Sequence, residues 1–236
     1  MSALTLNKPK IRGADLPYED GVPLESSWHL DAMYLLIEIL RYYWQDRLDV
    51  YIGGNMFVYF DPDQDKRRNF RGPDFFVVKG VKDNTPRKSW VVWEEEGLTP
   101  DFVIELASET TAEFDVGAKK KIYEQELRTP EYVVYNPVTE KLRGWRLVGG
   151  RYVPVAPDPQ GWLWCEELGL WLGTVEHTFV KHTRPVKVLR FFDTEGQLIL
   201  SEKEAASAAR RTAEAARQAA EAEVARLKAL LKKEGK

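Results

Sequence analysis

Two stretches, Arg71-Gly72-Pro73-Asp74-Phe75-Phe76-Val77-Val78 and Pro100-Asp101-Phe102-Val103-Ile104-Glu105-Leu106-Ala107-Ser108, decide the fold of this chain. Both contain β-prone runs that follow a Pro-Asp pair, so we expect two neighbouring strands. Asp74 lies at the start of the first strand, and Glu105 lies inside the second. A carboxylate among apolar residues is unfavourable to bury unless a cation or hydrogen bonds hold it. Strand pairing that sets the two carboxylates side by side would form an all-oxygen site suited to Mg²⁺.

The rest of the chain alternates between helical and strand patterns. Apolar spacing predicts a helix over 28–44, and a capping box of Thr110 and Glu113 predicts a second helix that ends near Glu126. The pattern also predicts strands over 50–59, bent at Gly53-Gly54, and over 90–93 and 131–135, with a hairpin over 142–155 that turns at Gly149-Gly150. Short, aromatic-rich elements follow over 162–164 and 168–172. This order of elements indicates an α/β (α+β) fold with a mixed central sheet flanked by helices.

The segment from Ser201 to Lys236 differs in composition from the rest. Twelve of its residues are Ala and none is Pro, which favours a helix, and Ser201 with Glu204 forms a capping box at its start. Nine Lys or Arg against six Asp or Glu give this segment a net charge of +3, which leaves −6 for residues 1–200. A coiled-coil spacing, interrupted by Glu223, joins Ala213, Ala216, Ala220, Leu227 and Leu230. We expect a weakly oligomerising helix or a solvated tail.

Length and composition exclude several classes of protein. The chain of 236 residues can hold one full-sized domain with appendages. It contains no apolar run long enough to span a membrane or to serve as a signal core, and its single Cys165 allows no internal disulfide, so we expect a cytoplasmic protein. A formal net charge of −3 gives no overall attraction to nucleic acid, so such binding must depend on a local patch.

An ordered set of motifs carries a resemblance to a known family. The motifs are Gly72-Pro73-Asp74, the stretch 100–108, Asp115-x-x-x-Lys119-x-x-x-Tyr123, and Thr129-Pro130-Glu131-Tyr132-Val133-Val134-Tyr135-Asn136-Pro137. Residues 25–136 thereby resemble the bacterial family described as "putative restriction endonucleases" (Uma type), a branch of the PD-(D/E)XK nuclease superfamily. Residues 142–205 resemble the extension that many members carry. The chain departs from the superfamily pattern because Ala107, not Lys, stands two residues after Glu105.

The resemblance implies a restriction-endonuclease-like fold, and with the helix expected from composition at the C-terminus the chain has three parts. These are a nuclease-like core over 1–140, a small β-rich extension over 141–200 packed on the core, and the C-terminal helix over 201–236. The implied activity is metal-dependent endonucleolytic hydrolysis of phosphodiester bonds in DNA, with Mg²⁺ or Mn²⁺ as cofactor. The implied assembly is a homodimer or a higher homo-oligomer.

The resemblance also implies roles for individual residues. Asp74 and Glu105, with the backbone carbonyl of Leu106, would hold the metal. Lys119 would orient the attacking water or offset the charge that grows on the phosphate. Lys119 shares a helical face with Asp115 and Tyr123, whereas the two lysines that follow it are rotated away, so Lys119 is the preferred catalytic lysine.

Other interpretations of the same residues stay open. Asp74 could cap a turn, Glu105 could be ion-paired in the core without a metal, and Lys119 could belong to a solvated helix face. A residue near the first helix could also approach the metal site; the candidates are Glu25, His29 and Glu38. The alternative function is that of a catalytically weak or inactive nuclease-fold protein that acts in assembly or nucleic-acid binding.

Overall fold

The computed structural model describes residues 11–18, 26–62, 70–108, 112–180 and 183–234. The chain divides into two compact units, Met1–Ile199 and Leu200–Lys236. None of the helices within the described ranges has the length and apolar character needed to cross a membrane.

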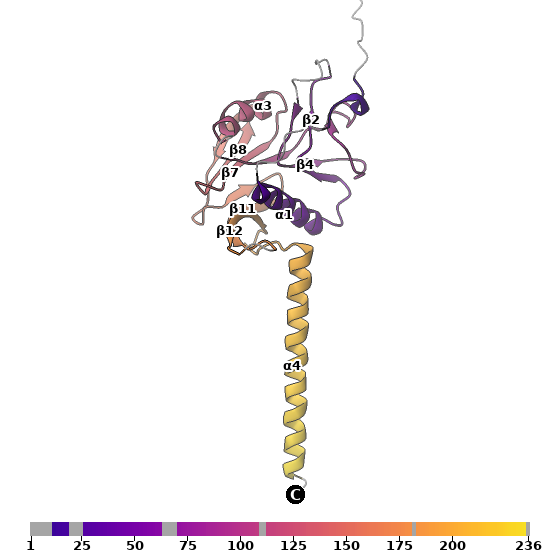
Figure 1. The fold of residues 1–236 in the computed structure, drawn as a ribbon, viewed down its shortest axis with the longest axis vertical. Coiled ribbons are helices and arrows are strands. Elements are labelled where there is room, and N and C mark those ends of the chain that lie inside the picture. Colours follow the sequence, from indigo (N-terminus) through magenta and orange to yellow (C-terminus); the bar gives the residue numbers. More distant parts are fainter. Residues whose placement is uncertain (1–10, 19–25, 63–69, 109–111, 181–182, 235–236) are drawn as a thin grey trace, which may run out of the picture. The chain divides into compact units, whose positions relative to one another are not determined.

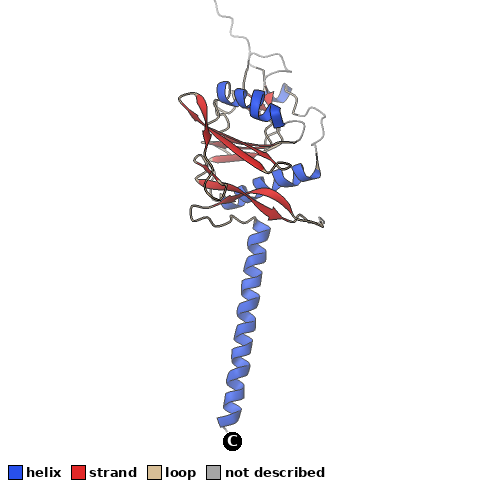
Figure 2. Cartoon of the chain, turned by 90° about the vertical axis from the view of Figure 1, so that its left-hand side faces the viewer, coloured by secondary structure: helices blue, strands red, loops and turns tan. Residues whose placement is uncertain are grey.

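A mixed six-stranded sheet forms the centre of the first unit (Figures 1 and 2). Its strands, in spatial order, are β1 (Val50–Gly53), β4 (Phe75–Lys79), β6 (Phe102–Leu106), β7 (Glu131–Asn136), β8 (Lys141–Val148) and β9 (Arg151–Val155). Strands β6 and β7 run parallel, and the other neighbours run antiparallel. The predicted α/β (α+β) class with a mixed central sheet is confirmed. The predicted hairpin extends this sheet, because β8 pairs with β7.

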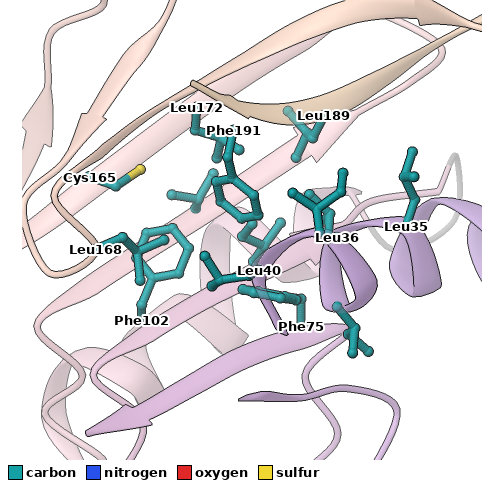
Figure 3. Close-up of a cluster of buried hydrophobic side chains, with 14 of the residues drawn as sticks. Leu35, Leu36, Leu40, Phe75, Phe102, Cys165, Leu168, Leu172, Leu189 and Phe191 are labelled. Atoms are coloured by element: carbon teal, nitrogen blue, oxygen red, sulfur yellow. The ribbon is translucent and has the colours of Figure 1, made fainter. Parts of the chain in front are cut away.

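Both faces of the central sheet are covered, so the side chains of β6 alternate between two cores. Helix α1 (Ser27–Tyr43) begins at the N-cap Ser26, as its hydroxyl accepts a hydrogen bond from the amide of His29. Its buried side chains join Phe75, Phe102 and Ile104 in the larger core (Figure 3). The opposite sheet face, with Phe76 and Val103, belongs to a second core.

Two smaller sheets complete the first unit. One contains β3 (Phe70–Arg71), β2 (Val58–Tyr59) and β5 (Trp90–Val91), preceded along the chain by a short 3₁₀ helix, Gly13–Asp15. The predicted strand over 50–59 is therefore two strands, β1 and β2. The other sheet contains β10 (Leu163–Cys165), β11 (Leu170–His177) and β12 (Val186–Phe192), and its apolar side chains close the larger core beside α1.

The predicted second helix is present but is divided into three pieces. They are α2 (Ala112–Phe114), a π-helical turn over Asp115–Lys119, and α3 (Lys120–Gln125). The predicted capping residue Thr110 lies outside the described residues. The prediction assumed 3.6 residues per turn, whereas a π-turn is wider and is often found at functional sites.

The second unit is a single helix, α4 (Glu202–Glu234). The predicted capping box is confirmed, because the amide of Ser201 donates to Glu204 Oε2 over 2.9 Å and the amide of Glu204 donates to Ser201 Oγ over 3.3 Å. All side chains from Ala209 to Leu230 are exposed.

Candidate active site

Strand pairing brings Asp74 and Glu105 together at one end of the β4–β6 ladder. Phe75 pairs with Ile104 in this antiparallel register, so Asp74, which precedes Phe75, lies opposite Glu105, which follows Ile104. The amide of Asp74 donates to Glu105 Oε2 over 3.4 Å, and the amide of Leu106 donates to Asp74 Oδ2 over 2.7 Å. Each carboxylate thus accepts a hydrogen bond from the other residue's strand, which fixes both side chains side by side.

Glu105 is the most deeply buried member of the pair, with 1% of its surface exposed. Its Oε2 lies 2.7 Å from Lys119 Nζ, and its Oε1 accepts a hydrogen bond from the hydroxyl of Tyr123 over 3.1 Å. Burial raises the pKa of Glu105 to about 8, because the opposing effect of the Lys119 charge is smaller and Asp74 and Asp115 add to the rise. A second cation at this site would therefore favour the ionised carboxylate.

Lys119 reaches Glu105 from the π-helical turn. Its ammonium also lies 3.5 Å from Asp115 Oδ1, one turn earlier. Burial alone would lower the pKa of Lys119, but the charges of Glu105, Asp74 and Asp115 outweigh it, so the pKa is raised and the ammonium stays charged. The next lysine, Lys120, lies over the ring of Trp145 at 4.7 Å from its centroid, and the third is exposed. The structure thus turns one of the three lysines toward the carboxylates.

His29 connects the first helix to this cluster. Its Nε2 lies 2.8 Å from Asp74 Oδ1, with 9% of the histidine side chain and 14% of the aspartate side chain exposed. The histidine therefore orients the Asp74 carboxylate. Of the two acidic candidates near this helix, Glu38 is exposed and Glu25 lies outside the described residues.

The backbone of Gly54 approaches the backbone of Asp74 closely. A Cβ atom added to Gly54 would lie 2.2 Å from the carbonyl oxygen of Asp74, so only glycine fits at this position. The next amide, that of Asn55, donates to the carbonyl of Pro73 over 3.0 Å. The Gly53-Gly54 pair, predicted only as a bend, thus lets the chain pack directly against the backbone of Asp74.

Two further members of the cluster were not singled out as site residues from the sequence. Asp115 is 3% exposed, and the hydroxyl of Tyr132 donates to its backbone carbonyl over 2.9 Å. Tyr123 stacks on Tyr132 with ring centroids 4.9 Å apart, which holds its hydroxyl against Glu105. The spacing of Asp115, Lys119 and Tyr123 by four residues is the signal that could have identified them.

Arg71 adds a half-buried cation whose charge interacts with Glu105 and Tyr123. Burial lowers the pKa of its guanidinium, and the charges of Tyr123 and Glu105 oppose this shift. Its Nη1 donates to the carbonyl of Phe70 over 2.5 Å, while its buried Nε has no hydrogen-bond partner among the described residues. The guanidinium therefore keeps hydrogen-bonding capacity next to the site.

The donor set fits Mg²⁺ in chemistry and number. Within the described ranges, no group of three or more His, Cys, Asp or Glu side chains is arranged to hold a metal. Mg²⁺ does not need one, because it is bound through one or two carboxylates and keeps several waters or phosphate oxygens. Each carboxylate oxygen has two lone pairs, so the hydrogen bonds to Asp74 and Glu105 leave capacity for a cation. The backbone carbonyl of Leu106, which follows Glu105 on β6, is a third candidate oxygen ligand.

Comparison with known proteins places the chain in a family. Residues 15–175 match the family model Uma2, described as "Putative restriction endonuclease". No curated protein matches the chain. Among solved structures, it is similar to one described as a "putative nuclease belonging to DUF820" from Anabaena variabilis, at 12% identity over 64% of this chain and 81% of that one, with a TM-score of 0.46.

Proposed function

The chain belongs to the Uma2 family, described as "Putative restriction endonuclease", and we propose that it is a metal-dependent endonuclease that hydrolyses phosphodiester bonds in DNA. The observation that carries the proposal is the contact of Asp74 with Glu105, together with the 2.7 Å approach of Lys119 to Glu105. Hydrolysis of a phosphodiester needs stabilisation of negative charge on the phosphoryl oxygens and a positioned water.

We assign these tasks to particular side chains. Asp74 and Glu105, with the Leu106 carbonyl, would hold the metal, which when bound would polarise a phosphoryl oxygen as a Lewis acid. Lys119 keeps its charge and can donate hydrogen bonds to the attacking water or to a phosphoryl oxygen. Tyr123 and Asp115 hold Glu105 and Lys119 in place, while His29 orients Asp74.

Assembly is a further part of the proposal. A two-fold symmetric homodimer would supply two active sites, one for each strand of a duplex. Helix α4 offers a seam for this contact, with Val224, Leu227 and Leu230 48%, 50% and 44% exposed. We therefore propose a homodimer or a higher homo-oligomer that acts on DNA.

Cleavage of supercoiled plasmid tests this function. The full-length protein is incubated with the plasmid in Mg²⁺, Mn²⁺ or EDTA, and nicked and linear products are quantified over time. The proposal predicts products with either metal and none in EDTA, and Asp74→Asn should remove the activity. Equal cleavage in EDTA would refute the metal requirement.

One observation favours the alternative, an inactive nuclease fold. The ammonium of Lys119 and the hydroxyl of Tyr123 give each oxygen of Glu105 a partner within the protein. A protein that had lost its chemistry could keep this ion pair as a core contact. The absence of products with either metal, combined with retained binding of DNA, would support this alternative.

A further inference from the structure

A pocket of about 390 Å³ lies beside the candidate site, between strands β6–β8 and the segment that follows β6. Ala107 and Val134 line it from the sheet, and Val116 lines it from the π-helical turn. Lys141 and Arg143, both exposed on β8, also line it. The pocket thus joins a small apolar floor to two cations.

The register of the sheet connects this pocket to Glu105. Glu105 pairs with Val134, and Val134 pairs with Arg143, so these residues form one row on the same face of the sheet. Because neighbouring strands lie about 4.8 Å apart, the backbone of Arg143 stands roughly 10 Å from that of Glu105. Lys141 is two residues from Arg143 on the same strand and therefore faces the same way.

The two cations differ from Arg146 on the same strand, because no carboxylate among the described residues pairs with them. Arg146, on the same strand, is paired with Glu131 at 2.8 Å. In the described part of the chain, the side chains of Lys141 and Arg143 have neither an ion-pair nor a hydrogen-bond partner. Lys120 adds a third positive charge nearby, since it covers Trp145, the next residue after Arg143 on this face. One carboxylate, that of Glu113, lines the same pocket.

We propose that Lys141 and Arg143 bind the phosphodiester backbone of the substrate strand at a phosphate next to the one that is cut. The guanidinium of Arg143 can bind a phosphate through two parallel hydrogen bonds, and Lys141 adds a point charge. This local patch would supply the attraction that a formal net charge of −3 does not. The proposal rests on the proposed function for the identity of the cut phosphate, but not for the binding itself.

Binding of labelled DNA tests the subsite without cleavage. Fluorescence anisotropy of a duplex and of a single-stranded oligonucleotide is measured with the full-length protein, in EDTA and in Ca²⁺, over a series of salt concentrations. The variants are Lys141→Gln and Arg143→Gln. The control is Arg151→Gln, which removes the same charge from a side chain 73% exposed on the neighbouring strand. Circular dichroism verifies that each variant is folded.

The proposal predicts that Arg143→Gln weakens binding about tenfold, and that each variant at the subsite lowers the slope of log affinity against log salt by about 1. Arg151→Gln should change affinity by no more than about twofold. Unchanged binding by both subsite variants, or no binding by the parent in either buffer, would overturn the subsite. A parent that binds through Arg143 but never cuts would refute the proposed function and leave the subsite standing.

Discussion

Strand β6 separates two cores that differ in chemistry. Phe102, Ile104 and Leu106 point into a core made almost wholly of apolar side chains from α1, the central sheet and β10–β12. Glu105, on the other face, enters a cluster with Lys119, Asp115 and two tyrosine rings. One strand thus stabilises the fold on one side and holds buried charge on the other.

Burial has different energetic consequences on the two faces of β6. The apolar core gains stability from area removed from water, whereas the charged cluster gains little, because desolvation opposes the attraction between its charges. Substitutions on the two faces should therefore separate stability from activity.

The largest effect is expected at Lys119. A lysine that acts on the water or on the phosphate contributes mainly in the transition state, so Lys119→Ala should lower kcat by about 10²–10³ with little loss of DNA binding. Lys120→Ala and Lys121→Ala should lose at most a few-fold. The comparison is made by plasmid cleavage at fixed salt, because phosphate contacts depend on salt. An essential Lys120 or Lys121 with a dispensable Lys119 would disprove the assignment.

Ile104→Ala should destabilise the apolar core on the other face of β6. Ile104 is fully buried, so its truncation removes apolar contacts and leaves a cavity that should reduce the free energy of unfolding by about 2–5 kcal/mol. Activity per folded molecule should change little, since the side chain points away from the cluster. Urea titration together with the cleavage assay measures both quantities. A stability equal to that of the parent would show that the apolar core can collapse around the lost side chain.

A smaller effect concerns pH in metal-free protein. The pKa of Glu105 is raised to about 8, above its value in the unfolded chain, so its contribution to stability is complete below the unfolded pKa and is lost as pH rises through about 8. The free energy of unfolding should fall by at most about 1.4 kcal/mol per pH unit in this window. Glu105→Gln should flatten the dependence, as measured by urea titration in EDTA from pH 5 to pH 9. The same slope in both proteins would assign the dependence to other groups.

The smallest effect on the first unit is expected from removal of helix α4. The first unit contains its own cores, so deletion of residues 205–236 should leave its unfolding midpoint unchanged. The far-UV helical signal should fall by the fraction that α4 contributes. Analytical ultracentrifugation should show weaker self-association. Loss of the folded body would mean that α4 contributes to its stability.

The sequence predicted the pairing of Asp74 and Glu105 because Asp74 directly precedes one short apolar strand and Glu105 lies within the next. It also indicated Lys119, since four-residue spacing to Asp115 and Tyr123 survives the π-turn. His29 was one of three candidates near the first helix, and the sequence could not single it out, because its contact with Asp74 depends on how α1 packs on the sheet. The same applies to the close approach of Gly54.

Strand β12 shows why part of the fold was missed. Its pattern is interrupted by Arg190, which is 1% exposed and donates from Nη2 to the carbonyl of Ile199 over 2.8 Å. In the sequence alone, an arginine in an apolar run indicates an interruption of the strand, because the hydrogen-bond partner that allows its burial is not visible. Likewise, the backbone change to a π-turn leaves no mark in apolar periodicity, and Gly117 alone does not specify it.

The most direct test of the account measures cleavage and stability together for Glu105→Gln. The change keeps the size of the side chain and its hydrogen bond with Tyr123, but it removes the ionisable carboxylate that would hold the metal. We predict a loss of plasmid cleavage in Mg²⁺ of at least about 10², with a free energy of unfolding at pH 7 within about 1 kcal/mol of the parent. Cleavage at the parent rate by the folded variant would contradict the central claim that this face of β6 is the nuclease site.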